Sequence, residues 1–380
     1  MKVIHLIHTL GMVSAGVYSS SSGLVESLNH LGVDTTLYGR TGGNNELIQV
    51  PHRGFAHWGP AKLGVARGMK SALMTDCPDV LHSHALWAYP SVLSQFFKKN
   101  KKIPNVVSIR NCLSDEALTR SRVKKKLVYH VLERRNLQAA SCLHALNQRE
   151  YLALRKLGLR TPIAVIGNGT FPPDIAEGVR RKLRQSDRWV LLHLGRLDPL
   201  KGTQELLDRW STLHRAGRLG MWRLKLVGPG SEAFIQKLQS QCVREGLTDT
   251  VEIMPPVAGN EKARLYEEAD GFVLPSAVEG QSNAVLEALA SGLPALVSPV
   301  VASGFDVLRD RMELWEEPFS SERLLQFMCL SEQMDRTREK RALEVRQFVS
   351  WESKARCLLE VYHWILGAGP RPPFVHSTAE

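Results

Sequence analysis

The sequence predicts an α/β protein in which two doubly wound domains, each built on a parallel Rossmann-like sheet, follow one another along the chain. Three observations support this fold class. Short apolar runs alternate with helical apolar patterns along most of the chain. The charged stretch 177-EGVRRKLRQSD-187 interrupts this alternation near the middle. The length of 380 residues, 43% of them hydrophobic, is sufficient for two cores.

The first domain is expected over residues 1–170. Its early loop, 8–16, contains Gly11 and Gly16 without forming G-x-G-x-x-G, and its second strand ends in Gly39-Arg40 instead of an acid, so a dinucleotide site of the usual kind is not expected. The expected elements of this domain are strand 2–7, helix 17–31, strand 33–38, strand 79–84, helix 90–98, strand 104–110, helix 120–138, strand 142–146, helix 147–157 and strand 163–168.

A linker is expected over 171–187, where the composition changes, and a second α/β domain over 188–349. Residues 369–380 are expected to form a loose tail. The elements expected in the second domain are strand 189–197, helix 203–216, strand 222–228, helix 232–245, strand 250–254, helix 260–268, strand 271–276, a helix from Ser282 or Asn283 to Gly292, and strand 295–298.

The cysteines and the start of the chain indicate the compartment. The six cysteines are scattered without a C-x-x-C pair, so a disulfide framework or a zinc ribbon is not expected. The expected compartment is a reducing cytoplasm. The start, 1-MKVIHLIHTLG-11, reads as a strand and not as a signal peptide. No apolar run of eighteen residues exists, so a membrane-spanning helix is not expected.

The positive charge of the chain is concentrated in one region. The net charge is +11, and residues 98–135 alone carry twelve Lys or Arg against three acids, a net charge of +9. Within it, 120-RSRVKKKLVYHVLERR-135 describes an amphipathic basic helix. An anionic membrane surface is the favoured partner, and a solvated helix face stays open as the alternative. No recognised nucleic-acid module accompanies the charge, so a nucleic-acid partner is not expected.

The stretch 275-PSAVEGQSNAVLEALASGLPAL-296 predicts a ligand site at the carboxyl edge of the second sheet. A strand, a loop and a helix follow one another here, and ligands of open α/β sheets bind outside the carboxyl ends of the strands. Gly280 lets the backbone approach a ligand closely, and Glu279 and Glu287 can accept hydrogen bonds from hydroxyl groups. The ordinary alternative is that Glu279 is a loop charge and Glu287 an exposed helix residue.

A second candidate site follows the strand that opens the same domain, in 195-GRLDPLKG-202. Arg196 and Lys201 lie at a strand-to-helix junction, where they can converge with helix N–H groups on a phosphate. The alternative is that Arg196 and Lys201 are two surface cations near a turn, because such residues would give the same local pattern. Both this motif and the Glu279/Glu287 segment are expected at the carboxyl edge of one sheet, which favours the phosphate interpretation.

His82 and His84 alternate on one strand, so their side chains are expected on the same face. A metal site is one interpretation, but no third ligand lies at strand or helix spacing, and we expect sheet-edge histidines that line a cleft and no metal. The motifs G-x-S-x-G, H-E-x-x-H and G-x-x-x-x-G-K-[ST] are absent, which removes the common hydrolase, zincin and P-loop interpretations.

Together these motifs resemble those of glycosyltransferase family 4 (group 1), retaining enzymes with the GT-B fold of two facing Rossmann-like domains. The resemblance covers nearly the whole chain. Its strongest elements are 195-GRLDPLKG-202, 227-VGPG-230 and 269-ADGFVLPSAVEGQSNAVLEALASGLPAL-296, which contains the E-x7-E of the family. The stretch 350-SWESKARCLLEVYHWIL-366 resembles the terminal helix that crosses back to the first domain in this family, so residues 350–368 are expected to do so.

The resemblance implies a role for each candidate residue. Arg196 and Lys201 would hold the diphosphate of a nucleotide-sugar donor in place of a metal, so no metal or other cofactor is expected. Glu279, with the backbone of Gly280 and Gln281, would contact the donor sugar, and Glu287 would accept from the ribose. The remaining donor-binding residues that the resemblance implies are Gly16 and Ser282.

One departure from the family concerns the loop after strand 104–109. The related enzymes usually have His-Gly there, and this chain has Arg110-Asn111. With His84, these two residues are the candidates for the acceptor or donor-sugar cleft. From its charge alone, Arg110 is a hypothetical partner of an acidic sugar or a phosphate.

The expected function is that of a retaining hexosyltransferase that moves a sugar from a nucleotide-sugar donor to a glycan or lipid-linked acceptor in cell-surface polysaccharide biosynthesis. The expected place is the cytoplasm, on the inner face of the membrane. Two alternatives stay open: a degenerate transferase that acts as a nucleotide-sugar sensor or assembly partner, and an epimerase or phosphorylase of the same fold.

Overall fold

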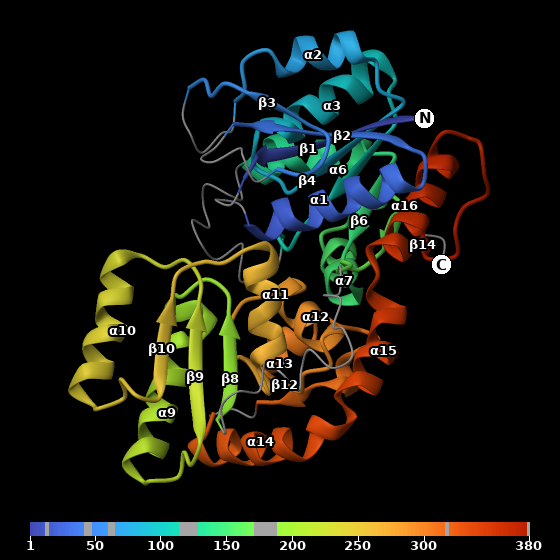
Figure 1. The fold of residues 1–380 in the computed structure, drawn as a ribbon. Helices are drawn as coiled ribbons and strands as arrows, with labels where there is room; N and C mark the ends of the chain where they lie inside the picture. Colours follow the sequence, from blue (N-terminus) through green and yellow to red (C-terminus); the bar gives the residue numbers. More distant parts are fainter. Residues whose placement is uncertain are drawn as a thin grey trace. The chain divides into compact units, whose positions relative to one another are not determined.

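The computed structural model describes residues 1–11, 15–41, 48–59, 65–113, 128–170, 188–315 and 319–377. Their contacts divide the chain into two compact units. Unit 1 consists of Met1–Gly169 with Ser350–Glu380, and unit 2 of Thr170–Val349. Each unit contains a largely parallel sheet and helices, which confirms the predicted α/β class (Figure 1). The predicted linker, 171–187, lies outside the described residues.

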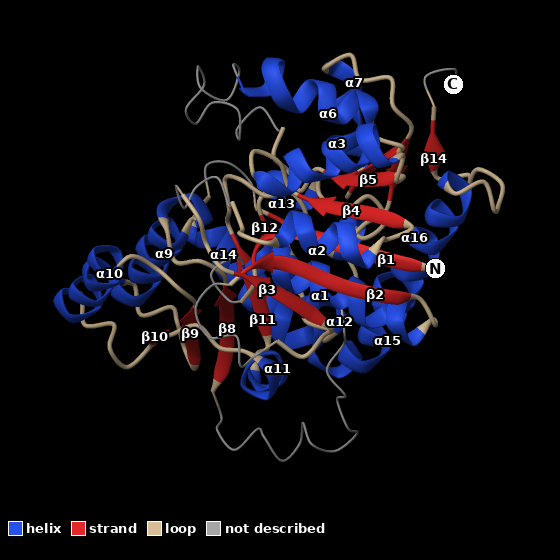
Figure 2. Cartoon of the chain, turned by 90° about the horizontal axis from the view of Figure 1, so that it is seen from above, coloured by secondary structure: helices blue, strands red, loops and turns tan. Residues whose placement is uncertain are grey.

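The sheet of unit 1 has eight strands within the described residues, in the order β14-β7-β6-β5-β4-β1-β2-β3. All neighbouring strands are parallel except β14, which pairs antiparallel with β7 (Figure 2). The strands are β1 (Lys2–Thr9), β2 (Asp34–Arg40), β3 (His52–Phe55), β4 (Val80–His84), β5 (Asn105–Ser108), β6 (Cys142–Ala145), β7 (Ile163–Val165) and β14 (Val375–His376). All five residues of β4 are buried, as expected for a central strand covered on both faces.

The helices of unit 1 follow the expected alternation. The predicted basic helix over 120–138 is described only from residue 128, where a π-helical turn leads into a short α-helix. The helical segments described in unit 1 are α1 (Ala15–His30), α2 (Met69–Asp76), α3 (Tyr89–Lys101), η4 (Tyr129–Glu133), α6 (Arg134–Ala139), α7 (Gln148–Lys156) and α16 (Trp351–Ile365).

The C-terminal helix α16 packs within unit 1. Its N-cap Ser350 accepts a hydrogen bond from the N–H of Ser353 (3.1 Å), which fixes where the helix begins. The ring of Trp351 lies so close to α1 that a Cβ atom on Gly23 would come within 2.4 Å of it. The apolar face of α16 shares one core cluster with α1 and the strands, so the helix is an integral part of this unit (Figure 1).

The prediction of a loose C-terminal tail is wrong for the end that the structure describes. Val375 and His376 form β14, which pairs with β7, and Val375 is buried. Arg155 donates a hydrogen bond to the carbonyl of His376 (2.8 Å). The short strand has no apolar run long enough to stand out in the sequence, so only its tertiary pairing reveals it.

The sheet of unit 2 has the strand order β10-β9-β8-β11-β12-β13 in the described part of the chain, and all its pairs are parallel. Its strands are β8 (Trp189–Leu194), β9 (Trp222–Val227), β10 (Val251–Met254), β11 (Gly271–Leu274), β12 (Ala295–Val297) and β13 (Glu313–Leu314). Phe272 and Val273 are adjacent in β11 and enter different core clusters, so helices cover both faces of this sheet.

The helices of unit 2 begin at the polar caps that the sequence contains. Ser231, Ser282 and Ser320, for example, each accept a hydrogen bond from a backbone N–H in the first turn of the helix that follows. The helical segments described in unit 2 are η5 (Pro199–Lys201), α9 (Thr203–Arg215), α10 (Glu232–Arg244), α11 (Gly259–Glu268), α12 (Asn283–Ala290), α13 (Pro299–Ala302), η6 (Arg309–Arg311), α14 (Ser321–Met334), η7 (Asp335–Thr337) and α15 (Arg338–Val349).

Each sheet contains a point where the order of the strands reverses. In unit 1 the chain proceeds to one side from β1 and to the other from β4, and in unit 2 the corresponding pair is β8 and β11. Loops that leave the carboxyl ends of such a pair diverge, which opens a crevice for a ligand. The candidate residues from the sequence lie at or beside these two points.

Candidate active site

The loops that follow β8 and β11 are fastened to each other at the switch point of unit 2. Gly202 has a φ angle of 69°, and a Cβ atom at this position would lie 2.3 Å from the carbonyl oxygen of Pro275. The N–H of Ala277 also donates to the carbonyl of Leu200 (2.8 Å). Only glycine fits at position 202, and its absence of a side chain lets the two loops touch.

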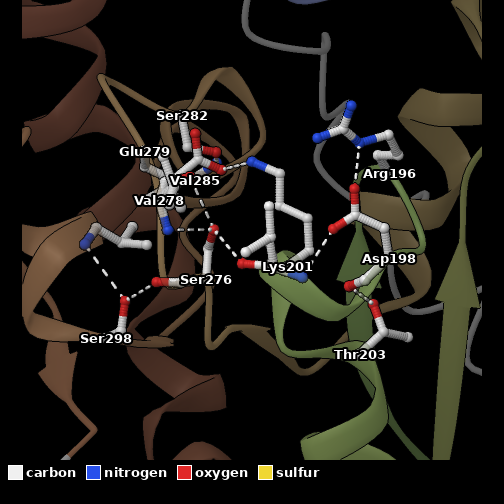
Figure 3. Close-up of polar contacts among 12 residues, drawn as sticks. Arg196, Asp198, Lys201, Thr203, Ser276, Val278, Glu279, Ser282, Val285 and Ser298 are labelled. Atoms are coloured by element: carbon white, nitrogen blue, oxygen red, sulfur yellow. Dashed lines mark hydrogen bonds and ion pairs between the residues drawn. The ribbon is translucent and has the colours of Figure 1, made fainter. Parts of the chain in front are cut away.

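Lys201 and Glu279 meet across these two loops. The ammonium group of Lys201 donates a hydrogen bond to Oε1 of Glu279, and Figure 3 shows the two side chains reaching toward each other. Their side chains are 17% and 15% exposed. The pair is therefore largely desolvated, which makes the hydrogen bond stronger than a surface ion pair.

Arg196 lies in the loop after β8 and is more exposed. Its Nε donates to Oδ2 of Asp198 at 2.7 Å, and its side chain is 56% exposed. Asp198 also accepts from the N–H of Leu200 (2.8 Å), which fixes the carboxylate at the start of η5. The structure pairs Arg196 with Asp198 and Lys201 with Glu279, so each of these two cations has its own carboxylate partner (Figure 3).

A pair of serines supports the loop that carries Glu279. The carbonyls of Leu200 (3.2 Å) and Val278 (3.0 Å) share the one hydrogen of the Ser276 hydroxyl, and the hydroxyl of Ser298 donates to the carbonyl of Ser276 (2.6 Å) (Figure 3). These bonds satisfy carbonyl groups that the turn leaves without helix or sheet partners. The position of Glu279 is therefore fixed from β8, β11 and β12 together.

Glu287 lies in α12 and is held by two side chains from α11. Lys262 donates to Oε1 (2.8 Å) and the hydroxyl of Tyr266 donates to Oε2 (2.8 Å). Burial, and then the neighbouring carboxylate of Glu287, raises the pKa of Tyr266, so its hydroxyl remains protonated and continues to donate. Sequence reasoning missed Lys262 and Tyr266, although their i, i+4 spacing on a helix before β11 is a signal that was available.

The residues between the two glutamates have mainly structural contacts. Ser282 caps α12, and the amide group of Gln281 donates to the carbonyl of Gly304 (3.2 Å). A Cβ atom on Gly304 would lie 2.2 Å from the carbonyl oxygen of Gly280, so the loop lies directly against the residues after α13. These contacts give the loop one conformation at the N-terminus of α12, where backbone N–H groups favour an anion.

In unit 1 the candidate residues surround the carboxyl ends of β4 and β5. Arg110 and Asn111 both have left-handed backbone conformations, with φ angles of 54° and 59°. Asparagine tolerates this region better than most residues. The N–H of Asn111 donates to Glu150. Gly16 lies in the first turn of α1, where its carbonyl accepts from the hydroxyl of Ser20 (2.9 Å).

Arg110 is held by two neighbours. Its Nη1 donates to Oδ1 of Asn168 (2.5 Å) and its Nη2 to Nδ1 of His84 (3.2 Å). Burial lowers the pKa of the Arg110 guanidinium to about 10, so the group remains a cation at neutral pH. Its Nε is buried and has no hydrogen-bond partner among the residues that the structure describes.

The predicted location of His82 and His84 needs correction. Both were expected to line a cleft, and both are buried in unit 1, with 0% and 1% exposure. They lie beside His5 and His144, which sequence reasoning missed. Nitrogen atoms of His5, His82 and His84 lie within 4.8 Å of one another, so these three rings form the group in the described chain whose geometry could admit a metal ion.

The comparisons with known proteins agree with this geometry. The family model described as "Glycosyl transferases group 1" matches residues 188–324, and that described as "Glycosyl transferase 4-like domain" matches residues 15–169. A D-inositol 3-phosphate glycosyltransferase from Segniliparus rotundus is 26% identical over 212 residues, which cover 54% of this chain and 46% of that protein. Across the curated relatives the matches span about a quarter to a half of their lengths.

Solved structures extend the likeness to almost the whole chain. Sucrose-phosphate synthase from Thermosynechococcus elongatus has a TM-score of 0.75 at 18% identity, covering 97% of this chain and 100% of that one. Anabaena HepE, solved in complex with UDP and glucose, has a TM-score of 0.71 at 18% identity, with coverage of 95% and 99%. At these identities the likeness shows the fold, which is the GT-B arrangement of two parallel-sheet domains. Within the described residues no helix is both long and apolar enough to span a bilayer.

Proposed function

This chain belongs to the group 1 glycosyl transferases of the GT-B fold, and from that premise we propose that it transfers a sugar from a nucleotide-sugar donor to a glycan or lipid-linked acceptor with retention of configuration. The observation that carries the proposal is the meeting of Lys201 and Glu279 at the switch point of unit 2. A cation and a carboxylate, set beside a helix N-terminus, match the phosphate and hydroxyl groups of such a donor.

The diphosphate is the part of the donor that Lys201 would bind. An ammonium group has three N–H bonds, and Glu279 takes one of them in this structure, so the others can donate to phosphate oxygens. Arg196 is exposed and ion-paired only with Asp198 among the described residues, so it can turn to the same group. Together they would stabilise the charge that develops on the leaving nucleoside diphosphate, the task that a metal ion performs in other transferases.

The ribose is the part that Glu287 would bind. Its two oxygens accept from Lys262 and Tyr266, and each carboxylate oxygen has a second lone pair that can accept from a ribose hydroxyl. Glu279 and the backbone of Gly280 and Gln281 would contact the sugar. In the retaining step, the bond from the anomeric carbon to phosphate breaks, the bond to the acceptor oxygen forms on the same face, and the acceptor proton passes to a phosphate oxygen.

The test of this proposal is calorimetric titration of the protein, without added metal, with UDP-, GDP-, ADP- and CMP-sugars. UDP-glucose comes first because HepE, which shares the fold, was solved with it. Binding of one donor that both Arg196→Ala and Lys201→Ala weaken would support the proposal. Absence of binding by folded protein would overturn the donor site, and retained binding without transfer to any acceptor would favour a sensor.

The acceptor side of the proposal rests on the charge of unit 1. Lys98, Lys99 and Lys101 lie in the last turn of α3, and the first half of the basic segment 120–135 lies outside the described residues. A basic segment of this kind would hold the protein on anionic lipid at the inner face of the membrane, close to a lipid-linked acceptor. Equal binding to neutral and anionic vesicles, or binding that salt does not weaken, would exclude this part of the proposal.

A further inference from the structure

Four buried histidines and Tyr362 form a continuous chain of hydrogen bonds in unit 1. His5 on β1 lies opposite His82 on β4, and the rings of His82 and His84 stack with centroids 4.3 Å apart. His144 on β6 lies opposite Ser108 on β5. The chain begins at Arg110 and ends at the carbonyl of Ile166, and the residues along it are His84, His5, Tyr362, His82, Ser108 and His144.

The direction of the chain can be worked out from its carbonyl end. The carbonyl of Ile166 can only accept, so Nε2 of His144 carries the hydrogen and donates to it (2.7 Å). Nδ1 of neutral His144 then accepts from the hydroxyl of Ser108 (2.7 Å). Since that hydroxyl has given its one hydrogen away, Ser108 accepts from Nε2 of His82 (2.7 Å). His82 must therefore accept at its Nδ1, where the partner is the hydroxyl of Tyr362 (2.6 Å).

The same direction follows independently from the other end. A guanidinium group can only donate, so Nδ1 of His84 accepts from Arg110 (3.2 Å), and Nε2 of His84 donates to Nδ1 of His5 (2.9 Å). Nε2 of His5 then donates to the oxygen of Tyr362 (3.3 Å). The two directions agree at Tyr362, whose hydroxyl accepts from His5 and donates to His82. No donor faces a donor anywhere along the chain.

This chain of hydrogen bonds requires each histidine to be neutral and to carry its hydrogen on Nε2. Burial, with the cation of Arg110 and the neighbouring rings, lowers the pKa of His5 and of His144 to about 3, and the pKa values of His82 and His84 are lowered for the same reasons. A second proton on His5 or His84 would place two donors against each other, and one on His82 or His144 would force the facing hydroxyl to turn its hydrogen away from its acceptor. The electrostatics and the hydrogen-bond geometry therefore demand the same protonation state.

The chain also accounts for the three rings whose geometry could admit a metal ion. A metal binds the lone pair of an imidazole nitrogen. In the chain, Nδ1 of His5, of His82 and of His84 each already accepts a hydrogen bond. A metal could bind only by breaking these bonds, so the cluster is built to orient side chains.

We propose that Tyr362, on the C-terminal helix, is a positioning residue for Arg110, and that it acts through His5 and His84. Among the described residues the guanidinium group donates only to Asn168 and His84, so the orientation of the His84 ring is one of two contacts that set where the cation lies. That ring is set by His5, and His5 by Tyr362. The relevance of this role to catalysis rests on the proposed function, together with the expectation from the sequence that Arg110 lies in the acceptor or donor-sugar cleft.

The first test reads the tautomers directly in the unaltered protein, by nuclear magnetic resonance of protein labelled with ¹⁵N in its histidines. The signals of His5, His82, His84 and His144 should not titrate near neutral pH, and each should show the neutral Nε2–H tautomer. His193 in unit 2 is the internal contrast, because its Nδ1 donates to the carbonyl of Val273 (3.1 Å), so it should appear as the opposite tautomer. An Nδ1–H tautomer or a charged ring among these four histidines, or zinc that remains bound through dialysis, would overturn the proposed hydrogen-bond chain.

The second test is Tyr362→Phe, which removes one hydroxyl and leaves the ring in the core. It should shift the His5, His82 and His84 signals, shift the Nε–H signal of Arg110 and speed its exchange with solvent. Tyr38→Phe is the matched control, because that hydroxyl of the same unit bonds to Asp76 instead. An unchanged Arg110 signal in Tyr362→Phe would overturn the positioning role.

The catalytic consequence is measured separately. If the proposed function holds, Tyr362→Phe should lower turnover about tenfold, the effect of one lost hydrogen bond of roughly 1.4 kcal/mol, while donor affinity changes much less because the residues proposed to hold the diphosphate and the ribose lie in unit 2. Unchanged turnover together with a shifted Arg110 signal would contradict the catalytic role of Arg110. Absence of transferase activity in the unaltered protein would contradict the proposed function and leave the resonance results as the test of the chain.

Discussion

The two units reverse their strand order at equivalent points and build opposite chemistry there. At the switch point of unit 2, opposite charges meet in the pairs Lys201–Glu279 and Lys262–Glu287, and all four side chains keep some contact with solvent. At the switch point of unit 1, the polar groups are neutral histidines with at most 2% exposure. One cation, Arg110, lies at the end of their hydrogen-bond chain. The same topology therefore presents partly exposed charged groups in one unit and a buried hydrogen-bonded support in the other.

The contrast teaches how each unit would respond to a ligand or to a proton. Ion pairs with spare donors and acceptors can rearrange around a nucleotide at small cost. A hydrogen-bond chain with one allowed direction cannot rearrange locally, because a change at one ring forces a change at the next. Unit 2 is thus suited to take up and release a charged substrate, and unit 1 to hold a fixed geometry.

The largest expected effect is acid destabilisation that is greater in unit 1 than in unit 2. The pKa of His5 and of His144 is about 3 in the folded state and that of His193 about 4, against 6.5 when unfolded. Because the folded pKa values are depressed, the unfolded chain takes up protons first, and stability falls as pH drops below about 6.5. At about pH 5 each group costs roughly 2 kcal/mol, so the pair in unit 1 costs about 4 and His193 about 2.

Hydrogen exchange along a urea series at about pH 7.5 and about pH 5 would measure this difference, since it reports each unit separately. Glu133 and Glu150 work in the other direction, because burial raises the pKa of each, but these two carboxyls of unit 1 oppose four buried histidines whose pKa values are lowered. Equal losses in the two units would contradict the neutral, buried histidine chain.

The next effect separates backbone strain from a steric clash in unit 2. Gly202→Ala should cost about 3 kcal/mol, because the new Cβ meets the Pro275 carbonyl in addition to requiring a positive φ angle. Gly217 has a similar φ angle of 65° and nothing within 4 Å of a Cβ, so Gly217→Ala should cost about 1 kcal/mol. Urea unfolding measures both. Equal losses would show that the contact between the two loops is not tight.

Removal of the cation of the Lys201–Glu279 pair should weaken donor binding about 10- to 100-fold. Lys201→Ala removes a charge-assisted hydrogen bond to phosphate, worth roughly 1.5–3 kcal/mol. Lys225 is the matched control, because it is also ion-paired and 17% exposed but pairs with Glu252 and Glu268 on the β9 side of the sheet. Calorimetry with the donor that binds the unaltered protein checks this, and similar losses in Lys201→Ala and Lys225→Ala would show only a general effect of charge.

The two switch points also differ in how much of them the sequence could predict. Lys201, Glu279 and Glu287 each follow a strand within one strand–helix unit, so local pattern placed them at the carboxyl edge of a sheet. The histidine chain could not be found this way, because His82 and Tyr362 are 280 residues apart and meet only when α16 packs on unit 1. His5 faces His82 only because β1 pairs with β4, and strand pairing is a long-range property that local pattern does not contain.

The smallest predicted effect concerns Glu287, the carboxylate whose partners the sequence did not reveal. Tyr266→Phe removes one neutral donor from Oε2, and Lys262 continues to hold Oε1, so the carboxylate keeps its charge and loses part of its orientation. Nucleoside diphosphate affinity should fall about fivefold, since a single neutral hydrogen bond contributes about 1 kcal/mol. Lys262→Met should have a larger effect, because it leaves a carboxylate that is only 14% exposed without its counter-ion. If Tyr266→Phe weakened nucleotide binding more than Lys262→Met, the tyrosine would have to contact the nucleotide itself, and the role assigned to Glu287 would pass to its neighbour.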